Sequence, residues 1–216
     1  MTGIVDYNAG NIRSVEQALA ALGAPFILSK KTSDLENCDR LIFPGVGDAA
    51  YAMQQLSQTG FDDFLKEWTR AGKQLLGICL GSQIIFEHSE EGNVDCLGLL
   101  PGTIRSFESV WKEKSINSHL KVPHMGWNNI TFAAGGSKLL DSVPEQSDFY
   151  FVHSYLIQPA DTQIIKAFAD YGIPVPACVE QGNITAFQFH PEKSGVHGLQ
   201  ILKNYCSDDL QKKEAN

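Results

Sequence analysis

The stretch Leu75–Gln83, Leu-Leu-Gly-Ile-Cys-Leu-Gly-Ser-Gln, decides the fold. It begins with apolar residues, as a buried strand does, and then places Cys79 between Gly77 and Gly81. A sharp turn from a strand into a helix needs small residues at these offsets, because a Cβ atom would collide with the helix. The same geometry, the nucleophile elbow, is best known with serine in Gly-x-Ser-x-Gly. The stretch therefore predicts a strand–turn–helix unit with a cysteine at the strand end.

The predicted turn would place the sulfur of Cys79 above the sheet edge, at the positive end of the following helix. A helix N-terminus stabilises a thiolate, and the thiolate is the attacking form of cysteine. From these nine residues alone, a buried structural cysteine beside two turn glycines is the alternative. Both interpretations stay open at this point.

Composition limits the class of protein. The 216 residues suit one α/β domain, and 43% hydrophobic with 19% charged residues is typical of a globular chain. A net charge of −8 argues against nucleic acid or an anionic membrane as the main partner. Five cysteines without a Cys-x-x-Cys pair predict free thiols in a reducing cytosol, and the six histidines lack metal-ligand spacing. With no signal peptide and no apolar run of about 20 residues, we expect a cytoplasmic enzyme without a metal site.

The first half of the chain alternates strands with helices. Short apolar runs predict strands at 3–7, 25–28, 40–43 and 74–78. Apolar residues at 3.6-residue spacing predict helices after Asn11, a potential N-cap, and over about 49–56 and 61–71. This alternation predicts a mostly parallel sheet with right-handed crossovers, whose ligands bind at the carboxyl ends of the strands.

The second half, after Gly98, shows no obvious long helix until its end. Its predicted strands are 104–107, 126–132, 149–157, 163–169, 177–181 and 184–188. Turn residues separate them, which predicts antiparallel or mixed pairing. A last helix follows Ser194, and residues 207–216 form a polar tail. Without a linker or a repeat, residues 1–206 are expected to form a single domain.

A cysteine nucleophile needs a base and a group that orients that base. His190 follows the apolar Phe187-Gln188-Phe189, and Pro191 ends the strand there, so the imidazole is expected at the same sheet edge as Cys79. Glu192, two residues on, can hold the tautomer of the ring. An ordinary surface pair at a strand end is the alternative.

An oxyanion hole requires amide N–H groups directed at the developing negative oxygen. Leu80, directly after Cys79, supplies one amide, and Pro44-Gly45-Val46-Gly47 after the neighbouring strand can supply another. The alternative for this Pro-Gly segment is a turn that starts a helix.

Taken together, these segments resemble the class I glutamine amidotransferases over effectively the whole chain. Gly77-Ile78-Cys79-Leu80-Gly81 and Phe189-His190-Pro191-Glu192 are similar to the motifs of the class. Three further segments narrow the resemblance to the HisH-type glutaminase subunits of imidazole glycerol phosphate synthase: Asp6–Asn11, Pro44–Gly47 and Val122–Asn128. The segment Tyr150–Tyr155 is also of the family type.

The resemblance implies a three-layer α/β fold, with a central mostly parallel mixed sheet flanked by helices and an antiparallel portion in the second half. It implies a catalytic triad of Cys79, His190 and Glu192 that hydrolyses L-glutamine to glutamate and ammonia through a thioester, without a cofactor. Implied oxyanion residues are Leu80, Val46 and Gly47, and implied glutamine-binding residues are Gly47, Gln83, His153, Ser154 and Tyr155.

The resemblance also implies a heterodimer with a (β/α)8-barrel cyclase of the HisF type. Ammonia would pass to this cyclase, which makes imidazole glycerol phosphate and the purine-pathway intermediate AICAR in histidine biosynthesis. Matching positions at the partner face are Asn11, Trp127, Tyr150 and Lys193. A large exposed aromatic such as Trp127 is typical of a binding hot spot, and a core position is its alternative.

One position departs from the family pattern: Ser82 stands where members commonly have methionine or histidine. It leaves room for a paralogue that supplies ammonia to another pathway, such as surface-sugar synthesis. Two further rivals are a free-standing cysteine hydrolase, such as a γ-glutamyl peptidase, and a regulatory glutamine sensor without catalysis. Met125–Asn128 and Asp6–Asn11 favour the subunit over the peptidase, and an intact triad disfavours the sensor.

Overall fold

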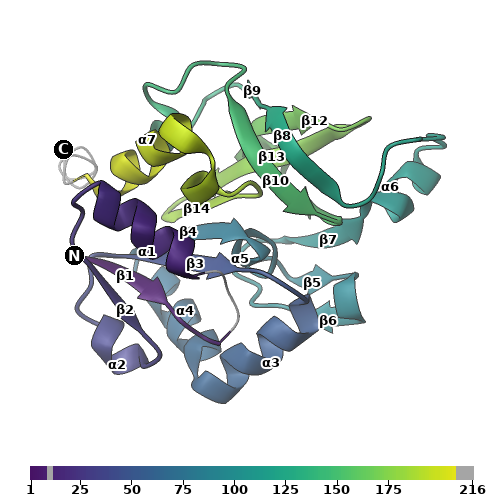
Figure 1. Cartoon of the computed structure of the whole chain (residues 1–216). Helices are drawn as coiled ribbons and strands as arrows, with labels where there is room; N and C mark the ends of the chain where they lie inside the picture. Colours follow the sequence, from purple (N-terminus) through teal and green to yellow (C-terminus); the bar gives the residue numbers. More distant parts are fainter. Residues whose placement is uncertain (9–11, 208–216) are drawn as a thin grey trace.

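The computed structural model describes residues 1–8 and 12–207, and a central sheet of eight strands organises them (Figure 1). In spatial order these strands are β2 (Phe26–Ser29), β1 (Thr2–Val5), β3 (Arg40–Gly45), β4 (Gln74–Cys79), β14 (Ile184–Phe187), β13 (Pro174–Gln181), β12 (Ile165–Asp170) and β9 (Thr131–Phe132). Neighbours from β2 to β14 pair in parallel, and those from β14 to β9 pair antiparallel. The predicted change from parallel to antiparallel pairing in the second half is confirmed.

Helices cover both faces of this sheet, which gives three layers (Figure 1). On one face lie α1 (Ile12–Ala21) and α7 (Gly195–Cys206), and on the other lie α3 (Ala49–Thr59) and α4 (Phe61–Arg70). Side chains alternate along each strand, so Ile42 packs with α1 and α7 while Leu41 and Phe43 pack with α3 and α4. The buried strands are apolar on both faces for this reason.

Smaller elements extend the structure beyond the carboxyl end of β4. Strands β8 (His124–Asn129) and β10 (Asp148–His153) form an antiparallel pair. A four-stranded sheet contains β11 (Tyr155–Pro159), β7 (Gly102–Ser106), β5 (His88–Ser89) and β6 (Val94–Asp95). The short helices are α2 (Thr32–Leu35), α5 (Leu80–Gln83) and α6 (Phe107–Glu113), with 3₁₀ turns at Glu91–Asn93, Lys138–Leu140, Thr162–Ile164 and Pro191–Lys193.

Several sequence predictions are wrong. The single strand expected at 126–132 is two strands, because β8 pairs with β10 while β9 pairs with β12, and Ile130 lies between them. The strand expected at 163–169 begins only at Ile165, after a 3₁₀ turn.

The single strand expected at 149–157 is two strands, because β10 pairs with β8 while β11 pairs with β7, and Ser154 lies between them. Phe107, expected to end a strand, begins helix α6. Ser106 caps this helix by accepting a hydrogen bond from the Ser109 N–H (3.0 Å).

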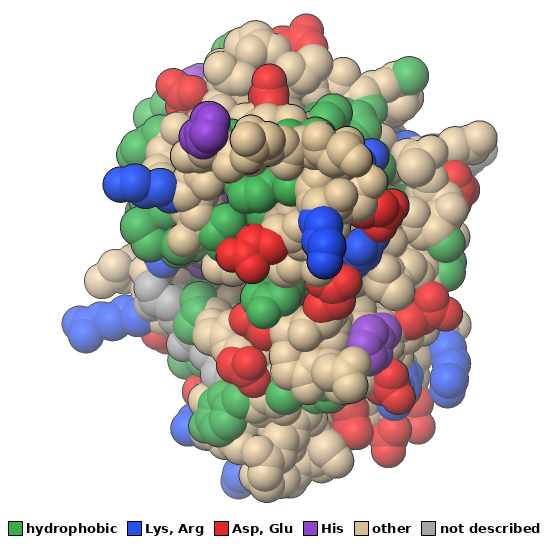
Figure 2. Space-filling view, turned by 90° about the vertical axis from the view of Figure 1, so that its right-hand side faces the viewer, with side chains coloured by type: hydrophobic (Ala, Val, Ile, Leu, Met, Phe, Trp, Pro, Cys, Tyr) green, Lys and Arg blue, Asp and Glu red, His purple; other side chains and the backbone are tan. Residues whose placement is uncertain are grey.

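The face that Figure 2 shows carries hydrophobic side chains together with side chains of both charges. On the face that Figure 2 shows, Lys and Arg side chains are scattered among acidic ones and form no continuous basic patch. Within residues 1–8 and 12–207, no helix is long and apolar enough to cross a membrane.

Candidate active site

The turn after β4 has the strained geometry that the sequence predicts. Cys79 adopts φ 55° and ψ −112°, a conformation that non-glycine residues rarely occupy. A Cβ atom on Gly81 would lie 2.0 Å from the Phe43 carbonyl oxygen, and one on Gly77 would lie 2.9 Å from the Gly81 carbonyl oxygen. Both glycines are therefore required for α5 to pack against β3 and β4.

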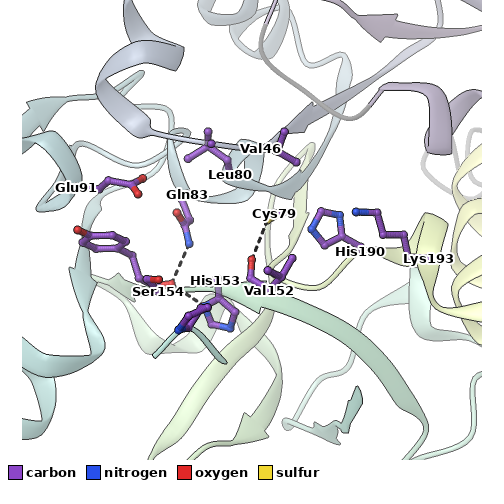
Figure 3. Close-up of a pocket in the computed structure, with 13 residues that line it drawn as sticks. Val46, Cys79, Leu80, Gln83, Glu91, Val152, His153, Ser154, His190 and Lys193 are labelled. Carbon is purple, nitrogen blue, oxygen red and sulfur yellow. Dashed lines mark hydrogen bonds between the residues drawn. The ribbon is translucent and has the colours of Figure 1, made fainter. Parts of the chain in front are cut away.

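Cys79 opens onto a cavity of about 270 Å³ at the carboxyl ends of the parallel strands (Figure 3). Thirteen residues line this cavity: Val46, Gly47, Cys79, Leu80, Gln83, Glu91, Pro123, Val152, His153, Ser154, Tyr155, His190 and Lys193. The cavity thus brings together every oxyanion and glutamine-binding residue that the sequence analysis named. Glu192 lies behind His190 and completes the predicted triad. Their catalytic and binding roles remain predictions.

The position of His190 follows from sheet pairing. Strand β14 runs parallel to β4, with Phe187 opposite Ile78, so the chain leaves both strands at the same edge. The His190 N–H then donates to the Tyr150 carbonyl oxygen (3.0 Å), which ties the histidine to β10. Figure 3 places the imidazole beside Cys79 on the cavity wall.

Glu192 orients the His190 ring. The Nδ1 of His190 lies 2.7 Å from Oε1 of Glu192, and only 2% of each side chain is exposed. A surface pair, the alternative left open by the sequence, is therefore wrong. Because Nδ1 is held by the carboxylate, Nε2 is the ring nitrogen left to interact with the cavity side.

The charge of His190 depends on its two neighbours. Burial by itself lowers the pKa of His190, but interactions with the Cys79 sulfur and the Glu192 carboxylate raise this pKa to about 9. A protonated His190 beside the Cys79 sulfur gives the site a proton donor at neutral pH.

This arrangement predicts the titration of His190. In the wild-type protein its NMR pKa is expected near 9, and in Glu192→Gln it should be lower because the carboxylate charge is gone. Since the folded pKa exceeds the unfolded value of 6.5, His190 contributes stability below pH 6.5 that is lost as pH rises through about 9. Urea unfolding across this range should show a smaller loss for Glu192→Gln. A wild-type pKa at or below 6.5 would contradict the arrangement.

The predicted oxyanion segments lie on both sides of the nucleophile. Gly45 of β3 is paired with Cys79, so Val46 and Gly47 follow directly beside the elbow. Gly47 has φ 97°, a conformation that favours glycine. Leu80 begins α5, and its first-turn N–H has no partner within the helix.

The opposite wall is held by the Gln83 side chain. Its Nε2 donates to the Tyr155 carbonyl oxygen (2.9 Å) and to Oε1 of Gln188 (2.8 Å). Both amide hydrogens are used, and Oε1 of Gln83 is left to accept a hydrogen bond from a ligand. The Cys79 thiol donates to the Val152 carbonyl oxygen (3.8 Å) on the same wall (Figure 3).

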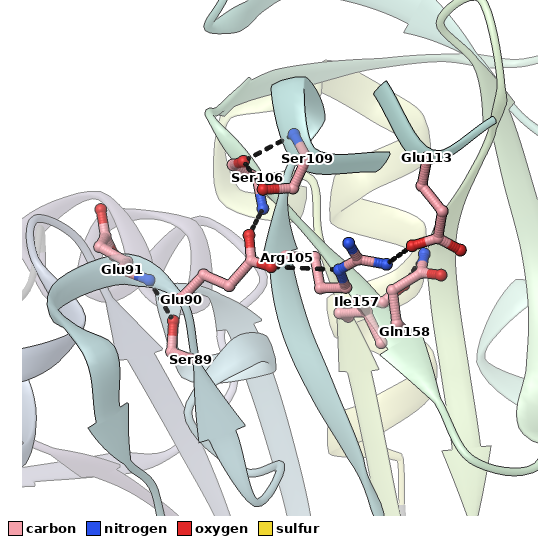
Figure 4. Close-up of polar contacts among 9 residues, drawn as sticks. All are labelled: Ser89, Glu90, Glu91, Arg105, Ser106, Ser109, Glu113, Ile157 and Gln158. Carbon is pink, nitrogen blue, oxygen red and sulfur yellow. Dashed lines mark hydrogen bonds and ion pairs between the residues drawn. The ribbon is translucent and has the colours of Figure 1, made fainter. Parts of the chain in front are cut away.

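The sequence analysis missed Glu91. Its carboxylate lines the cavity, accepts a hydrogen bond from the Ala49 N–H (3.0 Å) and is partly buried, which raises its pKa. Ser89 and Glu90 fix the turn that carries it: Ser89 Oγ accepts from the Glu91 N–H (3.1 Å), and Glu90 Oε2 accepts from the Ser106 N–H (2.8 Å) (Figure 4). No local pattern marks Glu91, because its place depends on the packing of distant segments.

Arg105 reinforces this turn from β7. Its Nε donates to Oε1 of Glu90 (3.1 Å), and its guanidinium also pairs with Glu113 of α6 (Figure 4). These contacts tie the turn before Glu91 to two elements of the small sheet region. These contacts therefore help to hold Glu91, the acidic residue of the cavity lining, in place.

Three of the predicted partner residues lie together beside the cavity. Trp127 is 59% exposed, so its alternative as a core residue is wrong. Its ring contacts Tyr150 edge-on at 6.2 Å between centroids, and Lys193 Nζ lies 6.0 Å from the Tyr150 ring centroid. Asn11, the fourth predicted partner residue, falls outside the described residues.

Ser82, the position that departs from the family pattern, is fully buried and does not line the cavity. Its Oγ donates to the Cys79 carbonyl oxygen (2.6 Å), so it supports the elbow from within α5. Among the described residues there is also no group of three or more His, Cys, Asp or Glu side chains able to hold a metal ion.

Comparisons with known proteins show the family of this chain. Residues 3–208 match the family model for class I glutamine amidotransferases. The chain belongs to the class I glutamine amidotransferases.

Relatives within this family are subunits named HisH of imidazole glycerol phosphate synthase. The HisH subunit of Halalkalibacterium halodurans is 46% identical over 206 residues, which cover 95% of this chain and 94% of that protein. The one from Bacillus subtilis is 42% identical over 214 residues, which cover 99% of both chains.

Solved structures of lower identity share the amidotransferase fold. A glutamine amidotransferase crystal structure has a TM-score of 0.71 at 20% identity, covering 95% of this chain and 96% of that one. A putative GMP synthase component from Thermoplasma acidophilum has the same TM-score at 17% identity, covering 99% and 96% of the two chains.

Proposed function

We propose that this amidotransferase is the glutaminase subunit of imidazole glycerol phosphate synthase, with residues 1–206 as one glutaminase domain. The observation that carries the proposal is the buried His190–Glu192 pair beside the strained Cys79, in a chain 46% identical to a HisH subunit. The enzyme hydrolyses L-glutamine to L-glutamate and ammonia, and the ammonia serves histidine biosynthesis.

In the first half of the proposed reaction, the Cys79 sulfur attacks the side-chain amide carbon of glutamine. His190 Nε2 carries the proton that the Cys79 sulfur has given up, and the amide oxygen becomes an oxyanion that the Leu80 N–H and the Val46–Gly47 segment stabilise. His190 then donates its proton to the leaving nitrogen, so ammonia departs and a thioester remains on Cys79.

In the second half, water attacks the thioester carbon. His190 accepts a proton from this water and returns it to the Cys79 sulfur as the thioester breaks, which releases glutamate. Glu192 keeps the ring oriented and stabilises its positive charge in both halves. The role we assign to each of these residues needs no cofactor.

The cavity supports glutamine as the substrate. The Glu91 carboxylate is placed to pair with the α-ammonium group of an amino acid, and Gln83 Oε1 can accept a further N–H. His153, Ser154 and Tyr155 line the same cavity. We assign glutamine binding to these residues and to Gly47.

The relatives are subunits of a synthase, so we infer that this chain also works with a cyclase subunit. We assign this partner to the HisF type, a (β/α)8 barrel in a heterodimer, and the cytoplasm as its compartment. The exposed Trp127, with Tyr150 and Lys193 beside it at the cavity, is the face we assign to the cyclase. Asn11 is assigned to the same face by resemblance only.

The test is glutamine hydrolysis with and without the cyclase. The purified chain is expected to hydrolyse glutamine slowly, and much faster when the histidine-pathway cyclase and its ligand are added. Full activity without a partner would favour a free-standing hydrolase instead. Activation only by an amidotransferase partner of a sugar pathway would redirect the assignment to a paralogue.

A surface variant sharpens this test. Trp127→Ala should weaken cyclase binding by about 2 kcal/mol, because a large exposed aromatic is the kind of residue that anchors interfaces. Tyr51→Ala is the matched control, since Tyr51 is a half-exposed aromatic on α3 that does not line the cavity. Equal affinities for the two variants, measured by calorimetry, would contradict the assigned interface.

A further inference from the structure

Two buried histidines lie in an unbroken row of hydrogen bonds that begins at the cavity wall, where His153 is one of the lining residues. Nδ1 of His124 lies 2.9 Å from Nε2 of His153, and Nδ1 of His153 lies 2.7 Å from the Tyr155 carbonyl oxygen. At the other end, Nδ2 of Asn128 lies 3.2 Å from Nε2 of His124 and donates to the Asp170 carbonyl oxygen (2.8 Å). The residues of this row come from β8, β10, β11 and β12.

Chemistry allows only one direction for this row. A carbonyl oxygen only accepts, so Nδ1 of His153 carries a proton and its Nε2 is the acceptor of a neutral ring. His124 must then donate from Nδ1, which leaves its own Nε2 to accept from the Asn128 amide. The Asn128 amide nitrogen is identified independently, since it also donates to the Asp170 carbonyl. Both histidines therefore hold their proton on Nδ1.

The surroundings keep both rings neutral and fixed. The exposed fractions of His124 and His153 are 2% and 6%, and burial lowers their pKa values to about 4 and about 3. His124 is stacked between Phe151 and Tyr171, with centroid distances of 4.6 Å and 4.0 Å. A ring held between two others cannot turn to a different partner without disturbing the packing.

The row of hydrogen bonds ends at the Tyr155 carbonyl oxygen, which also holds the side chain of Gln83 in the cavity wall. The Tyr155 carbonyl oxygen accepts from Nδ1 of His153 and also from Nε2 of Gln83. We propose that His124 and Asn128 are positioning residues for glutamine: through His153 they fix the Tyr155 carbonyl, and thereby the Gln83 amide, in the orientation that leaves Gln83 Oε1 for the substrate. This role rests on the proposed glutaminase function.

Three variants of His124 separate positioning from packing, measured as glutaminase kinetics in the complex with the cyclase. His124→Asn keeps an amide N–H close to the place of Nδ1, so its KM for glutamine should stay within about threefold of the wild-type value. His124→Leu retains more of the side-chain volume than His124→Asn but has no N–H donor. His124→Gln has an amide N–H, but this group lies near the position of the histidine Nε2 and not that of Nδ1. Both should raise KM about tenfold with little change in kcat, the effect of one lost hydrogen bond.

The opposite ranking would overturn the proposal. If packing alone matters, His124→Leu should outperform the smaller His124→Asn. Equal KM values for all three variants, or a loss confined to kcat, would also contradict a positioning role. A wild-type complex that does not hydrolyse glutamine would instead refute the proposed function.

A spectroscopic test is independent of activity and of variant folding. Nitrogen-15 NMR of the wild-type chain at pH 7 should show His124 and His153 as neutral rings with the proton on Nδ1. A proton on Nε2 of either ring would break the row and overturn the inference, whatever the kinetics show. This measurement decides the hydrogen-bond direction even if glutamine proves not to be the substrate.

Discussion

Replacing Cys79 with alanine is expected to lower the rate of glutamine hydrolysis by about 10⁴-fold or more, because none of the other described residues that line the cavity is a cysteine able to form the thioester. The backbone of the elbow should change little, since Ser82 still donates to the carbonyl of residue 79. In the complex, synthesis from added ammonia should continue, because free ammonia bypasses the glutaminase step. Glutamate release and cyclase product, measured in the same samples, check both expectations.

Cys96→Ala is the matched control for this experiment. Cys96 is, like Cys79, a free cysteine; it is partly buried and does not line the cavity. Its replacement should therefore leave glutamine hydrolysis close to the wild-type rate. An unchanged rate of glutamine hydrolysis in Cys79→Ala would contradict the proposed mechanism. The alternative of a regulatory glutamine sensor, in which this cysteine has no catalytic role, would then be favoured.

The second large effect is expected from Gly81→Ala. The new Cβ atom would lie 2.0 Å from the Phe43 carbonyl oxygen, which is backbone in the middle of the central sheet and has no room to move aside. Either β3 or α5 must shift by about 1 Å, and we expect a loss of about 4 kcal/mol in the free energy of unfolding. Glutaminase activity should disappear with the elbow geometry.

Gly23→Ala separates collision from backbone strain. Gly23 has φ 64° and nothing within 4 Å of the position its Cβ would take, so only the conformational cost of about 1 kcal/mol applies. Urea unfolding of the two variants should differ by about 3 kcal/mol. Similar stabilities would mean that the contact between α5 and β3 can relax, against the packing described above.

Much of the framework follows from local patterns. The strands before Cys79 and before His190 are recognisable as apolar runs ending in turn residues, and their parallel pairing brings both residues to one edge. Apolar spacing likewise marks α1, α4 and α7. These features depend on residues within about ten positions of one another, where periodicity and turn chemistry carry information.

Other features have no local signal. The break at Ser154 arises because residues on either side pair with different strands, and the stretch 149–157 is apolar enough to resemble one strand. Glu91 reaches the cavity only through contacts of its turn with α3 and β7. The exposure of Trp127 depends on which face of β8 is turned toward the hydrogen-bonded pair His124 and His153.

The sequence by itself determined the elbow at Cys79, the succession of strands and helices, and the residue types of the predicted triad. Only the tertiary structure decided that His190 and Glu192 are buried together, that Glu91 joins the cavity, and that His124 reaches Tyr155 through His153. The physical reason is range. Turns and amphipathic periods are set by neighbours along the chain, whereas burial and hydrogen-bond partners are set by segments that meet only when the sheets pack.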